Sequence, residues 1–153
     1  MFRIAEFYHV SPSVFGGDAS SVPLPTRATS GSAGYDFFTP VPIELAPGET
    51  VTVPTGIRAR IAEGWVLFVL PKSGLGFRYR LRLDNTVGVI DSDYRGEIMV
   101  SLHNHSGQTQ EIADGERIAQ LVITPFLRVE FTETDELSDT VRGAGGFGST
   151  GKI

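Results

Sequence analysis

Short runs rich in Val, Ile, Leu and Phe alternate along the chain with turns rich in Gly, Pro, Asp and Ser. Runs of this kind at fairly regular spacing are typical of an all-β protein. The run from Trp65 to Leu70 is unbroken, which predicts a strand that is buried on both faces. Further strands are expected at residues 51–53, 57–61, 86–90, 97–102, 110–112, 117–123 and 128–131. The pattern therefore predicts a jelly-roll-like β-barrel or sandwich.

Other segments refine this picture of strands and turns. Residues 86–90 and 97–102 flank the polar turn 91–96, so we expect these two runs to form a hairpin. One short helix is expected at residues 73–79, with Ser73 as its candidate N-cap. Residues 11–32 are rich in Ser, Pro and Gly and are expected to be partly loop. We expect residues 1–137 to form the jelly-roll domain and residues 138–153 to form a flexible glycine-rich arm.

Composition and charge exclude several classes of function. A length of 153 residues fits one domain with a real core. The absence of cysteine excludes disulfides, thiolate catalysis and cysteine zinc sites. A net charge of −5 argues against a general nucleic-acid binder. Residues 1–10 lack the apolar run of a signal peptide, and no stretch is long enough to span a membrane. We expect a cytoplasmic protein with neither nucleic acid nor a membrane as a partner.

The glycine-rich sequence from residue 142 to 151 carries residues suited to a phosphorylated ligand. Glycines let successive backbone N–H groups converge on an anion. Arg142 offers a planar fork for phosphate oxygens, Ser149 and Thr150 offer hydroxyl groups, and Phe147 offers a ring that can stack on a ligand. The alternative is a disordered terminus without a role. Gly146 to Lys152 matches the letters of a P-loop, but that motif needs a following helix, and Ile153 stands where its Ser or Thr would be.

Four other clusters carry polar groups at strand ends or turns. Asp91 ends a strand, where a carboxylate can take a proton from water; the alternative is ordinary turn chemistry. The stretch Lys72-Ser73-Gly74 combines a cation, a hydroxyl group and a helix start, which suits an anion. Residues 33–36 place a carboxylate after a glycine turn, and residues 115–120 lead from a turn into a strand, where Glu116 and Arg117 are expected to pair with each other. His103 and His105 show no metal-ligand spacing and are interpreted as surface residues.

These five clusters, in this order, resemble the trimeric dUTP pyrophosphatase family from Pro25 to Lys152. The resemblance implies a jelly roll that forms a homotrimer, with active sites shared between subunits. It implies hydrolysis of dUTP to dUMP and pyrophosphate, with Mg2+ bound to the triphosphate as cofactor. Such an enzyme limits uracil incorporation into DNA and supplies dUMP for dTMP synthesis.

The resemblance also implies a role for individual residues. Asp91 matches the general base that orients the attacking water, and Asp36 matches the carboxylate that holds the hydration shell of Mg2+. Asn85, the backbone of residues 89–91 and Met99 match the uracil pocket. Tyr94 matches the ring against the deoxyribose, and Phe147 matches the ring that stacks on uracil. The substrate-binding residues implied in total are Lys72, Ser73, Gly74, Asn85, Val89, Ile90, Asp91, Tyr94, Met99, Gln120, Arg142, Phe147, Gly148, Ser149 and Thr150.

One departure and two alternatives accompany this resemblance. The family usually has Arg where this chain has Lys72, which keeps the charge and loses the bidentate fork. A dCTP deaminase of the same fold would need a catalytic Glu at the position of Ser101. A regulatory module that binds the nucleotide without turnover is the alternative that is not an enzyme.

Overall fold

The computed structural model describes residues 4–11 and 18–146, and these residues form an all-β fold with antiparallel pairing. This confirms the fold class that the sequence predicts. The strands are β1 (Ala5–His9), β2 (Tyr35–Phe38), β3 (Ile43–Leu45), β4 (Thr50–Pro54), β5 (Ile57–Ile61), β6 (Trp65–Leu70), β7 (Leu81–Leu83), β8 (Gly88–Ile90), β9 (Met99–Asn104), β10 (Gln110–Ile112) and β11 (Arg117–Pro125). Two helical turns accompany them, η1 (Ala19–Ser21) and η2 (Leu75–Tyr79). No helix in the described part of the chain has the length and apolar character needed to cross a membrane.

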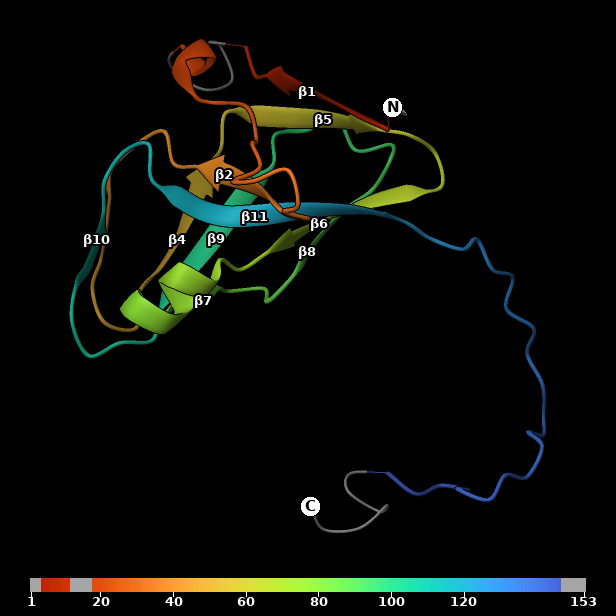
Figure 1. Cartoon of the computed structure of the whole chain (residues 1–153). Helices are drawn as coiled ribbons and strands as arrows, with labels where there is room; N and C mark the ends of the chain where they lie inside the picture. The colour runs from red at the N-terminus through yellow and green to blue at the C-terminus, as the bar shows by residue number, and fades with distance from the viewer. Residues whose placement is uncertain (1–3, 12–17, 147–153) are drawn as a thin grey trace.

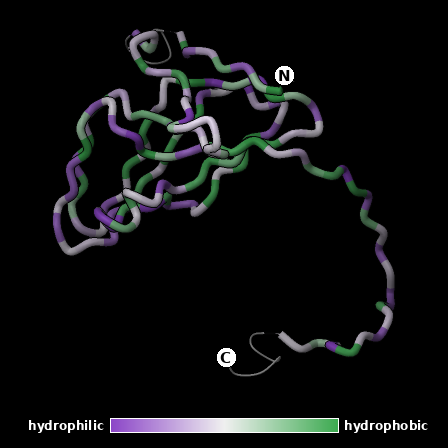
Figure 2. The backbone as a smooth tube through the Cα atoms, viewed as in Figure 1, coloured by the Kyte–Doolittle hydropathy of each residue, from purple (hydrophilic) through white to green (hydrophobic). Residues whose placement is uncertain are grey.

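Two sheets share one hydrophobic core. The larger sheet has the strand order β2-β11-β6-β8, and the smaller has the order β4-β9-β7 (Figure 1). Two-stranded ribbons, β1-β5 and β10-β3, flank them. Side chains from both sheets meet in the core, for example Leu67 and Leu121 from the larger sheet and Val53 and Leu102 from the smaller. Apolar residues are accordingly concentrated in the strands of the two sheets (Figure 2).

Alternation of apolar and polar residues sets which side of each strand is buried. In β5, Ile57, Ala59 and Ile61 are buried, while Arg58 and Arg60 face outward. This period of two is the natural consequence of a pleated strand with one face on the core. In the unbroken run of β6, the neighbouring residues Val66 and Leu67 are both buried, as expected for a strand covered on both faces, whereas Phe68 and Leu70 are only partly buried. The expected bounds of β5, β6 and β10 are confirmed.

The expected hairpin between the runs 86–90 and 97–102 is not formed. β8 pairs with β6, placing Ile90 opposite Leu67, whereas β9 pairs with β4 and β7 in the other sheet. The segment between them carries the chain across the core, and the buried Thr55 anchors its end by donating a hydrogen bond to the Ile98 carbonyl at 2.7 Å. Alternation in the sequence predicts which residues are buried, but it does not select the partner strand.

The strand expected at residues 128–131 is also absent. After β11 the chain leaves the sheets as a long extended segment (Figure 1), in which Leu127 is 87% exposed and Phe131 is 95% exposed. A strand needs a neighbour to satisfy its backbone hydrogen bonds, and this chain offers none to these residues within the part that the structure describes. The pattern also does not predict β1, β2, β3 and β7, because each is short and carries charged or polar residues.

The helical turn η2 ends at Tyr79, as the sequence predicts, and differs from the expectation in its N-cap. Ser73 is not its N-cap: Gly74 occupies that position without a side-chain hydrogen bond. At the other end, Arg80 closes the turn in the left-handed conformation with φ 57°. This conformation costs a residue other than glycine about 1–2 kcal/mol, which is why glycine is common at that position.

A buried asparagine fixes the loop between β9 and β10. Asn104 is fully buried, and its side-chain amide donates to the carbonyls of Leu45, Ala46 and Gln108 at 2.8–3.2 Å. Its side-chain oxygen accepts hydrogen bonds from the backbone and hydroxyl of Ser106. All hydrogen-bonding groups of this amide are thus used, which ties β3 to the end of β9.

Candidate functional site

Asp36 is the centre of a buried ionic cluster. It lies in β2, opposite Gln120 of β11, and is 5% exposed. Its Oδ1 accepts a hydrogen bond from Lys72 Nζ at 2.7 Å, and its Oδ2 is paired with Arg117 Nε at 3.1 Å. The cluster holds two cations and one anion, so it carries a net positive charge. This electrostatic balance favours an anionic ligand over a metal ion.

The strand register brings the predicted phosphate contacts to this cluster. Gln120 lies between Asp36 and Leu70, and its Nε2 donates to the Pro71 carbonyl at 3.0 Å. Lys72, Ser73 and Gly74 follow directly where β6 ends. Two neighbouring cavities of about 350 and 390 Å3 are lined by Lys72, the first together with Ser73 and Gln120 and the second together with Gly74. Five predicted site residues therefore lie in one region, at the end of β6.

Gly34 leaves room for the end of the Gln120 side chain. A Cβ atom at this position would lie 2.5 Å from Gln120 Oε1, which is shorter than any stable contact between these atoms. A larger residue would force the Gln120 side chain out of its position against Pro71. The glycine before the Asp36 strand thus has a steric role in the site.

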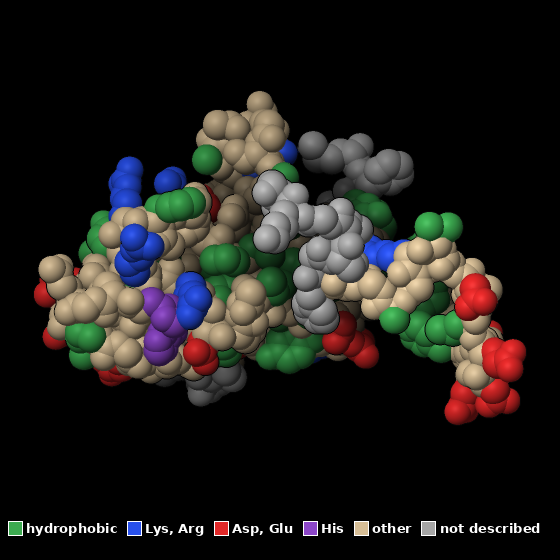
Figure 3. Space-filling model, turned by 90° about the horizontal axis from the view of Figure 1, so that it is seen from below, with side chains coloured by type: hydrophobic (Ala, Val, Ile, Leu, Met, Phe, Trp, Pro, Cys, Tyr) green, Lys and Arg blue, Asp and Glu red, His purple; other side chains and the backbone are tan. Residues whose placement is uncertain are grey.

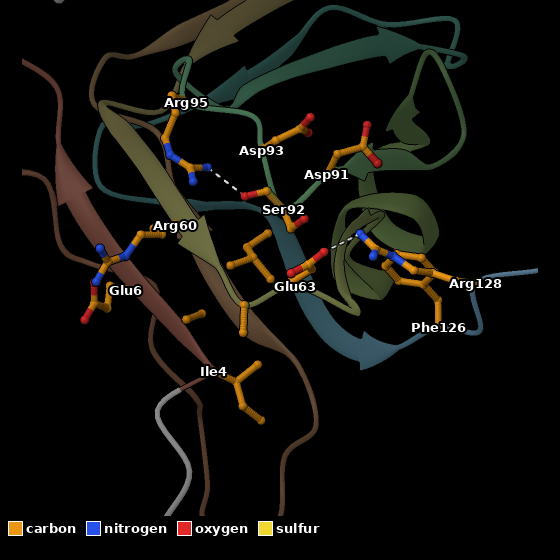
Figure 4. A pocket seen from close by; sticks show the side chains of 13 residues that line it. Ile4, Glu6, Arg60, Glu63, Asp91, Ser92, Asp93, Arg95, Phe126 and Arg128 are labelled. Carbon is orange, nitrogen blue, oxygen red and sulfur yellow. Dashed lines mark hydrogen bonds and ion pairs between the residues drawn. The ribbon is translucent and has the colours of Figure 1, made fainter.

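Asp91 lies in a separate cavity of about 830 Å3 at the end of β8 (Figure 4). Its neighbours on the turn, Ser92 and Asp93, line the same cavity. Arg95 stabilises the turn by donating to the Ser92 carbonyl at 2.7 Å, and Arg128 pairs with Glu63 across the cavity at 2.6 Å (Figure 4). Asp91 is thus held by a folded turn at the end of a strand, as the sequence predicts for a candidate base.

Tyr94 is fixed on the same turn. Its backbone N–H donates to the Asp91 carbonyl at 3.2 Å, and its hydroxyl donates to the Glu97 carbonyl at 2.9 Å. The ring lies so close to Gly96 that a Cβ there would overlap it. This exposed ring therefore has a defined position and can form a flat wall for a ligand.

β8 is an edge strand, which leaves part of its backbone available. It pairs with β6 on one side and has no sheet partner on the other among the described residues. Val89 is 58% exposed, and Asn85 lies in the turn before the strand. The next residue, Thr86, has φ 66°, a strained conformation for a β-branched side chain. Fixed backbone donors and acceptors on such an edge can bind the polar edge of a ligand. Met99 is partly exposed at the start of β9.

Asp91 and the phosphate cluster lie at opposite ends of β6. Because β8 is antiparallel to β6 and Ile90 is opposite Leu67, Asp91 lies beside the start of β6. Ser73 follows the end of that six-residue strand. At about 3.3 Å per residue, the two groups are separated by roughly 20 Å. Within one chain they therefore cannot act on the same atom.

The predicted arm residues are placed only in part. Arg142 is exposed, and its Nε donates to the Gly145 carbonyl at 2.7 Å within a local turn. Phe147, Gly148, Ser149 and Thr150 lie outside the described residues. In the structure of a single chain, Arg142 contacts no other predicted site residue in the described part. The division into a domain and a flexible arm stays a prediction.

Three arginines near the site were not predicted as functional residues. Arg117 was expected to pair with Glu116, but it pairs with Asp36 across the sheet. The expectation was wrong because the partner is distant in the sequence and is brought near by the pairing of β2 with β11. Arg80 and Arg82 line the same cavity as Ser73 and Gln120. The only signal for them in the sequence is the closely spaced basic series at residues 78, 80 and 82.

A metal site is not evident from side chains alone. The described residues contain no group of three or more His, Asp or Glu that could hold a metal ion. Oδ1 of Asp36 already accepts a hydrogen bond from Lys72, and Oδ2 forms an ion pair with Arg117. These surroundings do not fit a metal ligand.

Comparison with known proteins identifies relatives over most of the chain. A family model described as dUTPase matches residues 20–151. A deoxyuridine 5'-triphosphate nucleotidohydrolase from Hahella chejuensis is 48% identical over 135 residues, which cover 86% of this chain and 89% of that protein. The structure is similar to that of the Staphylococcus bacteriophage 80alpha dUTPase with dUpNHpp, with a TM-score of 0.85, 26% identity and 99% and 100% of the two chains covered. It is also similar to a dUTPase from Streptococcus mutans, with a TM-score of 0.70, 32% identity and 82% and 98% coverage.

Proposed function

The chain belongs to the dUTPase family, and from this premise we propose how its residues hydrolyse dUTP to dUMP and pyrophosphate. The family match over residues 20–151 carries the proposal, because this range includes all five sequence clusters. The identity of 48% to a named deoxyuridine 5'-triphosphate nucleotidohydrolase supports the same activity. The positions of the site residues indicate which step of the reaction each residue serves.

Asp91 activates the attacking water. The carboxylate accepts a proton from the water as its oxygen attacks the α-phosphorus, and the bond to the bridging oxygen of the β-phosphate breaks. Pyrophosphate leaves with that bridging oxygen, and the proton passes from Asp91 to solvent. The fixed turn around Asp91 supports this role, because a base must be held in position relative to the phosphorus.

The cluster around Asp36 binds the phosphate chain. Lys72, Ser73, Gly74 and Gln120 present a cation, a hydroxyl group, a backbone N–H and an amide to one region. Phosphoryl transfer depends chiefly on positioning and charge neutralisation, which these groups supply. Mg2+ enters as part of the substrate, bound to the triphosphate, and no step passes through a metal held by the protein. A contact from Asp36 to the hydration shell of that ion stays a prediction, because its surroundings in the structure suit the positioning of Lys72 and Arg117.

The edge of β8 and the Tyr94 ring select the nucleoside. Backbone groups of residues 89–91, with Asn85 and Met99 nearby, form hydrogen bonds to the edge of uracil and reject cytosine, whose donors and acceptors are inverted at two positions. Tyr94 lies against the sugar and leaves no room for a 2′-hydroxyl group. Phe147 then covers the base from the arm, while Arg142, Ser149 and Thr150 bind the γ-phosphate.

A homotrimer completes each site. The roughly 20 Å between Asp91 and Ser73 requires that a second copy supply one of them. The exposed apolar side chains of the segment after β11, including Leu127, Val129 and Phe131, give the chain a surface that another copy would cover. In this arrangement one copy supplies the phosphate cluster, another supplies Asp91, and the arm closes over a neighbouring site.

The direct test is a nucleotide-specificity assay. With Mg2+, the purified protein is expected to release pyrophosphate from dUTP and much less from dTTP, dCTP or UTP. Intact dUTP at micromolar concentration would contradict the proposal. Binding of dUTP without turnover would favour the regulatory module, and release of ammonia from dCTP would favour the deaminase despite the hydroxyl group at Ser101.

Substitution of Gly34 tests the position of Gln120. In Gly34→Ala, the new methyl group displaces the Gln120 side chain from Pro71. We expect the KM for dUTP to rise by about twofold to tenfold, as for the loss of one hydrogen bond, with little change in melting temperature because the end of the glutamine side chain can move. Gly31→Ala is the matched control, since nothing lies within 4 Å of a Cβ at that position. Equal KM values for the two variants would exclude Gln120 as a phosphate contact.

A further inference from the structure

Two arginines without an assigned role lie beside the proposed phosphate contacts. Arg80 and Arg82 line the cavity of about 350 Å3 that also contains Lys72, Ser73 and Gln120. Arg80 ends the helical turn η2, and Arg82 is the outward-facing residue of β7. Both side chains are exposed and therefore available to a ligand. A volume at the lower end of the range for ligand pockets suits part of a nucleotide rather than the whole molecule.

The charge balance of this cavity favours an anion. Its lining contains the cations Lys72, Arg80 and Arg82, and no carboxylate lines it within the described ranges. The Lys72 ammonium is already bound to Asp36 at 2.7 Å, so much of its charge is compensated. The positive charge that is left to bind an anion therefore comes from Arg80 and Arg82. Their planar forks can each bind two phosphate oxygens, which a lysine cannot do.

The direct partner of the Arg82 side chain is a histidine rather than a carboxylate. Arg82 contacts the His105 ring through Nε and also through Nη2, the latter at 3.0 Å from Nδ1. Loss of hydration, followed by the charges of Arg82 and His103, lowers the pKa of His105 below the ordinary histidine value. At neutral pH this partner is therefore an uncharged imidazole. Figure 3 shows basic side chains beside the histidines on this face, with an acidic side chain next to them.

The backbone of Arg80 gives independent support. Its φ of 57° is a conformation that favours glycine, so the arginine side chain is kept at a position where it destabilises the helix end. In the described part of the chain, the Arg80 guanidinium has no hydrogen-bond or ion-pair partner that would offset this strain. Strained residues of this kind occur where a functional requirement outweighs the local cost.

We propose that Arg80 and Arg82 form a subsite for the terminal phosphates of the nucleotide, beyond the contacts made by Ser73 and Gln120. This inference rests on the proposed function, because it deepens the description of the same site. The two guanidinium groups bind the β- and γ-phosphates in the substrate and stabilise the pyrophosphate as it leaves. They thereby distinguish a triphosphate from a monophosphate carrying the same nucleoside.

The test compares two nucleotides that differ only in whether they carry the terminal phosphates. Binding of dUpNHpp, a non-hydrolysable analogue of dUTP, and of dUMP is measured for Arg80→Gly and Arg82→Gln. Each variant is expected to weaken dUpNHpp binding by about fivefold to tenfold, because it removes charged hydrogen bonds to the phosphate oxygens. The loss is no larger than this because both arginines are exposed to solvent. Binding of dUMP is expected to stay at the wild-type level. Arg58→Gln, which removes an exposed arginine on β5 and the same charge, is expected to leave both affinities unchanged.

Thermal unfolding separates this role from a structural one. Arg80→Gly relieves the left-handed strain, so its melting temperature is expected to rise while the affinity for dUpNHpp falls. Equal losses for dUpNHpp and dUMP, or no loss for either, would overturn the subsite. Failure of the wild-type protein to bind dUpNHpp or to hydrolyse dUTP would instead overturn the proposed function on which the subsite rests.

Discussion

Asp91→Asn is expected to lower kcat for dUTP hydrolysis by about 10²–10⁴-fold, the usual contribution of a general base. The amide has almost the same shape as the carboxylate and can keep the turn at residues 91–95 folded. It cannot accept the proton of the attacking water. The affinity for dUpNHpp is therefore expected to stay close to that of the wild-type protein, and the loss should appear in kcat rather than in binding.

Asp93→Asn is the matched control for this loss. Asp93 lies two residues further along the same turn and lines the same cavity, so the substitution removes the same charge from the same region. Most of the turnover is expected to remain. A similar loss in both variants would indicate a general electrostatic effect of the turn, and near-normal turnover in Asp91→Asn would exclude Asp91 as the base.

The sequence alone predicts the features that depend on residues close together in the chain, such as the buried side of a strand. Alternation predicts the buried side of β5, and the unbroken run predicts the central strand β6. These features depend on residues close together in the chain, and the physics of a pleated strand determines them directly. The five polar clusters were found in the same way, because each is a continuous stretch at a turn or strand end.

Features that depend on distant partners were predicted less well. The alternation around Asp91 does not reveal that β8 joins β6 while β9 joins the opposite sheet. Arg117 has an acidic neighbour in the sequence, but the fold supplies Asp36 as its partner. Residues 128–131 alternate like a strand, but their side chains remain exposed because no partner lies within the chain. In each case the missing information is the identity of a neighbour in space.

The distance between Asp91 and Ser73 has a further consequence for the assembled protein. If each site takes its base from one copy and its phosphate cluster from another, two inactive variants can complement each other. Asp91→Asn removes the base, and Ser73→Asp places a negative charge where the phosphates bind. Ser73 is exposed, so the second substitution is compatible with folding. Each variant alone has every site damaged, because every site contains one copy of the altered group.

Hetero-oligomers of Asp91→Asn and Ser73→Asp chains, co-expressed with two different tags and purified by both, are expected to recover activity. Purification by both tags leaves only trimers with two chains of one kind and one of the other, and in a cyclic assembly about one site in three then combines an intact Asp91 with an intact Ser73. The recovered kcat per site should approach that fraction of the wild-type value. Mixed trimers of the double variant Asp91→Asn/Ser73→Asp with wild-type chains, purified in the same way, are the control, because only about one sixth of their sites are intact and about two thirds carry a single defect. No recovery in hetero-oligomers of verified composition, or a monomeric mass in solution, would contradict sites shared between copies, since one chain holds these two residues too far apart to act on the same phosphorus.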